Sequence, residues 1–166
     1  MATIFESIYA GDVDAVRSAV ADDPSLAAAR DENGRSAVRA ALYVHKQDVA
    51  DVLLEAKPEL DVFDASAAGD VDRLAELLDG DADLIGAYSE DGYTPLHFAA
   101  FFDQGKALRL LLDRGADVGA VARNDMEVRG LSVKDDSGSW VKMRASLAPL
   151  AARVDIDPAA VLLVKP

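Results

Sequence analysis

The sequence predicts a mainly α-helical chain: a short solenoid of about four helical hairpins, followed by an irregular C-terminal segment. An internal repeat, apolar residues at helical spacing, and Asp-rich turns between the apolar segments predict this fold class. Residues 10–56 align with residues 68–114 without a gap, with 13 identities in 47 positions. A fixed period of this kind is typical of stacked units that contact mainly their neighbours.

Each of the two aligned blocks contains two helical hairpins of unequal spacing. The residue that opens the second helix of each hairpin falls at Gly11, His45, Gly69 and Asp103, in steps of 34, 24 and 34. Apolar residues recur at helical spacing after these positions. Helices of about ten residues are marginal alone, so stacking must cover their apolar stripes. We expect the units at about residues 1–29, 30–60, 61–87 and 88–124, with a tight connection at 57–61.

The most specific motif lies in the fourth unit. Residues 91–100 read DGYTPLHFAA, and residues 107–118 read ALRLLLDRGADV. This succession of a Gly turn, T-P-L-H, A-A and L-L-L-x-x-G-A-D-V resembles the ankyrin repeat, whose period is about 33 residues. The resemblance covers about residues 2–124, is strongest at 88–121, and implies an all-α stack of hairpins. The second unit departs from the pattern because residues 33–41, NGRSAVRAA, contain neither Pro nor His.

Several residues of this motif have a physical role at the helix ends. Thr94 is expected to cap the start of a helix, and Pro95 to occupy its first position. The small side chains at 99–100 let two helices approach closely. Gly115 is expected to close the second helix in a left-handed conformation. The resemblance further implies that His97 bonds to its own turn and to the adjoining repeat.

The C-terminal segment, residues 125–166, does not continue the repeat. Two β-prone runs at 127–134 and 139–144 flank the turn residues 135–138 and predict a β-hairpin. An apolar run follows at 160–164. Because the last unit of a solenoid exposes an apolar stacking face, we expect this segment to act in capping or association. It would cover the stack in the same chain or by exchange between two chains; a frayed tail is the alternative.

The negative charge lies entirely on the repeats. Residues 1–124 carry 11 Lys and Arg against 24 Asp and Glu, whereas residues 125–166 carry 6 of each, and the whole chain has a net charge of −13. Such a field repels phosphate backbones, so we expect neither nucleic acid nor membrane as a partner. A protein with a basic or mixed surface is the expected partner, although the acidity could serve solubility alone.

Composition bears on the compartment. The chain has no cysteine, which fits a reducing environment, and it shows neither a signal peptide nor an apolar stretch long enough to span a membrane. We therefore expect a cytoplasmic protein.

No constellation of residues predicts catalysis. The two histidines, His45 and His97, fall on different repeats without zinc-ligand spacing, and no glycine-rich phosphate loop or nucleophile elbow is present. We expect no catalytic residue, no cofactor and no metal, and hence no enzyme. An active site of scattered carboxylates between the tail and the repeats stays open as a third alternative.

The resemblance also implies where a partner would bind. In ankyrin-like repeats, the two positions after the A-A pair lie on the concave face, and the turn tips flank them. Exposed aromatic clusters usually mark partner sites. The expected partner-binding residues are Tyr9, Tyr43, Val44, Phe101 and Phe102 on that face, with Glu90, Asp91 and Tyr93 at a turn tip. The alternative places Phe101 and Phe102 in the core.

The sequence thus predicts a non-enzymatic protein–protein interaction module that binds through the concave helical face and the turn tips. The alternative is a structural, self-associating protein in which residues 125–166 mediate formation of a homodimer.

Overall fold

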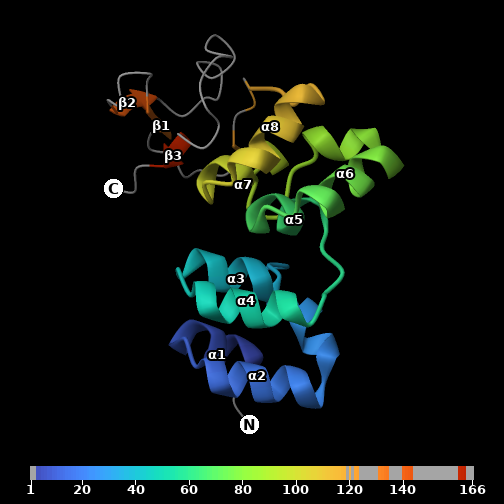
Figure 1. Cartoon of the computed structure of the whole chain (residues 1–166), viewed down its shortest axis with the longest axis vertical. Coiled ribbons are helices and arrows are strands. Elements are labelled where there is room, and N and C mark those ends of the chain that lie inside the picture. Colours follow the sequence, from blue (N-terminus) through green and yellow to red (C-terminus); the bar gives the residue numbers. More distant parts are fainter. Residues whose placement is uncertain are drawn as a thin grey trace. The chain divides into compact units, whose positions relative to one another are not determined.

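The computed structural model describes residues 3–118, 120, 122–123, 131–134, 140–143 and 161–163 (Figure 1). It divides into two compact units, residues 1–64 and 65–166, each larger than one of the four hairpin units expected from the repeat. These two are the first and the second unit of the structure, and each is considered by itself. The helices are α1 (Ile4–Ala10), α2 (Val13–Asp22), α3 (Ala37–Tyr43), α4 (Gln47–Glu55), α5 (Val62–Ala68), α6 (Val71–Gly80), α7 (Pro95–Phe101) and α8 (Gly105–Asp113). Two short 3₁₀ helices, η1 (Pro24–Ala28) and η2 (Ala82–Gly86), follow α2 and α6.

The sequence repeat is also a repeat of structure. In the alignment that places residue 10 on residue 68, the helices α1 to α4 fall on α5 to α8 with matching first and last residues, and η1 falls on η2. The prediction of a mainly α-helical chain built from helical hairpins is confirmed for the part of the chain that the structure describes.

Side-chain caps explain where several of these helices begin. Asp12 accepts a hydrogen bond from the backbone N–H of Ala15 at 3.0 Å, and Asp70 accepts one from Arg73 at the same distance. Such caps satisfy backbone donors that have no partner within the helix. The predicted cap at Thr94 is confirmed, since its hydroxyl accepts from the backbone N–H of His97 and proline occupies the first helical position.

The four positions expected to open the second helices share one backbone conformation. Gly11, His45, Gly69 and Asp103 have φ angles of 72°, 55°, 74° and 57°. All four lie in the left-handed region, which reverses the chain between two antiparallel helices. Gly115, with a φ angle of 89°, closes α8 as predicted.

Two of these four turns carry glycine, and a long side chain lies over each of them. A Cβ atom at Gly11 would meet the side chain of Lys46, and one at Gly69 would meet that of Gln104. Gln104 is further fixed by donating from Nε2 to the carbonyl of Ala67 at 3.1 Å. The second hairpin of each unit thus reaches across the turn of the first.

The core of each unit lies between its paired helices. In the first unit, α1 contacts α3 and α2 contacts α4, so the first and second helices form two layers. Ile8, Val16 and Leu53 are buried there. In the second unit, α8 contacts both α6 and α7, and its residues Leu108 and Leu111 are buried.

Beyond the helices, the backbone is described for three strands. β1 (Leu131–Lys134) pairs antiparallel with β2 (Trp140–Met143) and with β3 (Val161–Leu163), in the order β2-β1-β3. β3 also contacts α7. The expected turn at 135–138 lies outside the described residues, so the β-hairpin stays a prediction.

Candidate partner-binding surface

In the first unit, two tyrosines lie at the ends of the first helices. Tyr9 on α1 is 45% exposed, and its hydroxyl donates to Asp31 of the following turn at 3.5 Å. Tyr43 is the last residue of α3 and is half-buried, as is Val44 after it. The guanidinium of Arg35 lies 4.8 Å from the centre of the Tyr43 ring, a cation–π contact between the turn and the helix end.

In the second unit, the aromatic residues form a connected cluster. Phe101 ends α7 and Phe102 follows it; both are half-buried, and their rings meet edge to face at 4.8 Å. The ring of Phe102 also stacks on that of buried Phe98 at 6.4 Å, and Tyr93 contacts Phe98 at 5.8 Å. Phe102 and Tyr93 therefore contribute to packing as well as to the surface.

The turn tip next to this cluster is a tight hydrogen-bonded turn. The N–H of Ser89 donates to the carbonyl of Tyr93 at 2.9 Å, and the N–H of Gly92 donates to that of Ser89 at 2.9 Å. Glu90 is exposed at the tip and Asp91 is half-buried. The predicted partner-binding residues thus form two groups, one in each unit.

A buried ion pair lies beside the first of these groups. Arg39 on α3 has an exposed fraction of 0% and Asp64 on α5 one of 2%, with Nε and Oδ1 2.7 Å apart. Ser36 donates its hydroxyl to the same carboxylate at 2.6 Å. Burial raises the pKa of Asp64, the nearby Asp61 raises it further, and Arg39 opposes both effects.

This ion pair was not predicted from the sequence. The available signal was the repeat itself, because the alignment of the two blocks places Arg39 on His97 of the T-P-L-H motif. An arginine in place of a histidine at a buried position requires an anion nearby. Asp64 supplies it, and Arg30 extends the network by an ion pair with Asp61 at 2.8 Å.

His97 itself is held as a neutral ring. Its Nδ1 accepts from the backbone N–H of Thr94 at 3.2 Å and lies 2.7 Å from the Thr94 hydroxyl. Burial lowers the pKa of His97 to about 4, so the ring is neutral at neutral pH. Because Nδ1 accepts the N–H of Thr94, the proton of the neutral ring resides on Nε2. The expected bond to its own turn is confirmed, whereas Nε2 has no partner among the residues that the structure describes.

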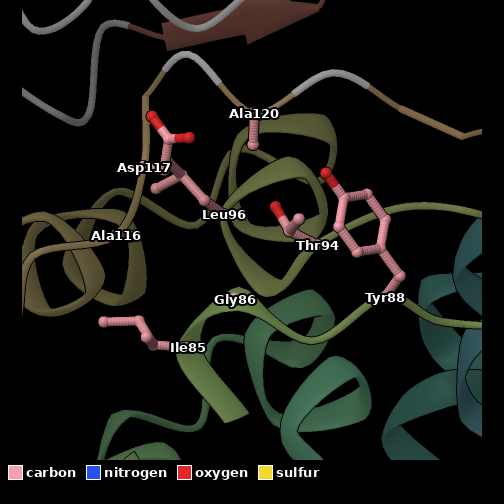
Figure 2. A pocket seen from close by; sticks show the side chains of 8 residues that line it. All are labelled: Ile85, Gly86, Tyr88, Thr94, Leu96, Ala116, Asp117 and Ala120. Atoms are coloured by element: carbon pink, nitrogen blue, oxygen red, sulfur yellow. The ribbon is translucent and has the colours of Figure 1, made fainter. Parts of the chain in front are cut away.

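A small pocket opens beside the start of α7 (Figure 2). Its volume is about 170 Å³. Figure 2 shows Tyr88 and Asp117 on opposite sides of the pocket, with Thr94 between them. The lining residues are Ile85, Gly86, Tyr88, Thr94, Leu96, Ala116, Asp117 and Ala120.

The described part of the chain contains neither a membrane-spanning helix nor a cluster of metal ligands. No helix there is long and apolar enough to cross a bilayer. Nor do three His, Cys, Asp or Glu side chains gather there as metal ligands would.

Paired helical hairpins, each with a left-handed turn between its two helices, define a helical repeat protein. Residues 91–123 match the family model of the ankyrin repeat, which confirms the resemblance at this segment. Ankyrin repeats generally mediate protein–protein interaction and are typically non-enzymatic. A search of curated proteins found no match.

Proposed function

We propose that this protein is a non-enzymatic interaction module that binds a partner protein through the ends of its first helices and its turn tips. One observation supports this most: Tyr43-Val44 and Phe101-Phe102 occupy equivalent positions at the ends of α3 and α7, and all four are half-buried. Rings held in this way offer a large contact area at low entropic cost.

The expected partner has a basic or mixed surface. Glu90 and Asp91 place carboxylates beside the aromatic cluster of the second unit, and the repeats carry the whole net charge of −13. In the first unit, Tyr43 already holds a guanidinium on its ring, that of Arg35. An arginine or lysine of a partner could form an ion pair with a carboxylate and a cation–π contact with an aromatic ring in the same region.

The remaining parts of the proposal follow from charge and composition. A field of this sign disfavours nucleic acid and anionic lipid as partners. The lack of cysteine supports a cytoplasmic location. Residues 125–166 are proposed to cap the repeats or to mediate association, and in the second case two copies would form a homodimer.

A capture experiment with paired variants tests this function. The bait carries Tyr43→Ala and Phe101→Ala, and leaves Phe102 unchanged because its ring stacks on Phe98. We expect at least one protein retained by the wild type to be lost by this bait, while its melting temperature shifts by only a few degrees. Mass spectrometry identifies the retained proteins, and a direct titration with the purified protein measures the loss of affinity.

The matched control carries Asp14→Asn and Asp72→Asn, two exposed positions at the starts of α2 and α6. This bait should retain the same partner. Equal retention by all three baits would contradict the proposed surface. A large drop in the melting temperature of the aromatic variant would instead assign Tyr43 and Phe101 to the core.

A further inference from the structure

The turn between η1 and α3 carries the dipeptide Asn33-Gly34, and Asn33 is exposed. An asparagine followed by glycine can react with its own backbone in water. The backbone nitrogen of the glycine attacks Cγ of the asparagine, and no Cβ hinders its approach. The bond from Cγ to the amide nitrogen breaks, and ammonia leaves with the proton of the attacking N–H. Water then opens the succinimide ring and leaves aspartate or isoaspartate.

In the folded chain, the attacking nitrogen is engaged. The N–H of Gly34 donates to the carbonyl of Asp31 at 2.9 Å. The carboxylate of Asp31 accepts from the N–H groups of Asn33 and Arg35, on either side of Gly34, each at 2.9 Å. A nearby carboxylate disfavours the deprotonated nitrogen that the attack requires, as one negative charge disfavours another. Residues 31–35, named the Asp31 turn, must therefore open before the reaction can proceed.

Further bonds hold the Asp31 turn in place. The hydroxyl of Tyr9 on α1 donates to Asp31 at 3.5 Å, and the N–H of Asp31 donates to the carbonyl of Arg35 at 2.9 Å. Arg30 donates from Nη1 to the carbonyl of Gly34 at 3.0 Å. Opening the turn breaks several of these bonds together, so it is a local unfolding step with its own free-energy cost.

The second unit shows that this kind of turn accepts an aspartate. The alignment of the two blocks places Asn33 on Asp91 and Gly34 on Gly92. Both glycines have a φ angle of 77°, and the N–H of Gly92 donates to the carbonyl of Ser89 at 2.9 Å, as that of Gly34 does to Asp31. Isoaspartate would instead add one carbon atom to the main chain of the turn and disrupt these bonds.

We propose that Asn33 is a site of spontaneous deamidation, and that the Asp31 turn sets the rate because Gly34 can attack only when the turn opens. Water is the only co-reactant. Conversion to aspartate replaces a neutral amide by a carboxylate in the turn that contacts Tyr9 through Asp31 and Tyr43 through Arg35. The first unit then carries the same residue as the second at this position.

Incubation of the full chain at mildly alkaline pH tests the proposal, with one sample folded and one unfolded in concentrated urea. Trypsin cleaves after Arg30 and Arg35, so Asn33 is the single asparagine of the peptide 31–35. Mass spectrometry measures its conversion to the acid, and chromatography separates the aspartate from the isoaspartate product. We expect conversion to be about tenfold slower in the folded than in the unfolded chain.

The variant Asp31→Ala should lose at least half of this protection while circular dichroism shows a folded chain. Asp31→Ser introduces the residue that the second unit has at this position, where the hydroxyl of Ser89 accepts from the N–H of Tyr93 at 3.3 Å. It should give an intermediate rate, and it gives a second measurement if the alanine variant fails to fold. The matched control, Asp14→Ala, removes an exposed carboxylate of α2 and should react as the wild type does.

Four results would overturn the proposal. Lack of conversion in urea would mean that Asn33 is not reactive, and equal rates in the folded and unfolded wild type would mean that the turn gives no protection. Equal rates in the folded wild type and both Asp31 variants would mean that this carboxylate does not set the rate. The product variant Asn33→Asp should keep the melting temperature of the wild type, and a large drop would mean that the turn does not accept aspartate. The outcome is independent of the proposed function, because no partner protein takes part.

Discussion

His97 shows how one buried ring links the helix cap to pH. The imidazole accepts from the backbone N–H of Thr94 only while it is neutral, and burial lowers its pKa to about 4 from an ordinary 6.5. The unfolded chain therefore takes up a proton near pH 6.5 that the folded chain does not take up until about pH 4. The folded chain is therefore more stable above pH 6.5 than at low pH. Its free energy of unfolding decreases by up to about 3 kcal/mol as the pH falls from 6.5 toward 4.

The variant His97→Gln isolates this effect. Glutamine can still accept from the N–H of Thr94 but does not titrate. We expect the free energy of unfolding of the wild type to fall more steeply between pH 7 and 4.5 than that of the variant, as measured by urea titration at each pH. The carboxylates common to both proteins cancel in the difference. Parallel curves would mean that His97 takes up its proton at the same pH in the folded and the unfolded chain.

Sequence reasoning succeeded at residues whose role is local. Thr94, Pro95 and Gly115 were predicted because a helix cap or a left-handed turn is determined by the residue and its near neighbours. The ring contacts of Phe102 were not predictable in the same way. They depend on how Phe98 on the same helix turns toward the core, and the motif does not specify this.

Among the elements, α3 and α5 are linked by a pair of opposite buried charges. Removing one partner leaves the other charged group buried without compensation, which costs about 3–5 kcal/mol. Replacing both by apolar residues of similar volume is often neutral. We therefore expect Arg39→Met and Asp64→Leu each to destabilise strongly, and the double variant to be more stable than either single variant.

Chemical denaturation of the four proteins in this cycle measures the coupling between the two residues. The control is Arg17→Met with Glu55→Leu, an exposed ion pair of the same unit with a distance of 3.3 Å between Nη1 and Oε2. Exposed pairs contribute less than about 1 kcal/mol, so these variants should change stability little. If Arg39 and Asp64 gave additive losses, the pair would not be energetically coupled.

The limits of sequence prediction are clearest for this pair. The helical hairpins were predicted from periodicity and turn residues, which repeat along the chain. Arg39 and Asp64 lie far apart in the sequence and come from different hairpins. Nothing local to either residue indicates burial, and only the comparison with His97 through the repeat could have raised the question.

For the whole molecule, the excess of carboxylates sets a dependence on salt. The net charge of −13 opposes compaction, and salt screens this repulsion over about 10 Å at 0.1 M. We expect the midpoint of urea unfolding to rise between 0.02 and 0.3 M sodium chloride, since urea is itself uncharged. A midpoint that falls over this range would mean that favourable ion pairs outweigh the repulsion.

At this scale, the sequence predicted the repeat and its hairpins but not the division into two units. The division falls after Asp64, within α5. The boundary expected near residue 124, where the repeat ends, stays a prediction. Composition and turn residues locate changes of sequence character, but packing between distant segments decides which residues form one compact body.

In each unit, a glycine turn in the first hairpin faces a long side chain of the second hairpin. This arrangement has a consequence for how the repeat array can be lengthened. The side chain of Lys46 lies against the turn at Gly11, and that of Gln104 against the turn at Gly69, so in each unit the second hairpin is matched to the first. Duplicating one hairpin alone would set two glycine turns, or two bulky ones, side by side. Gene duplication would conserve the fit only by copying both together, and a designer who wishes to lengthen this array should insert a complete pair of hairpins each time.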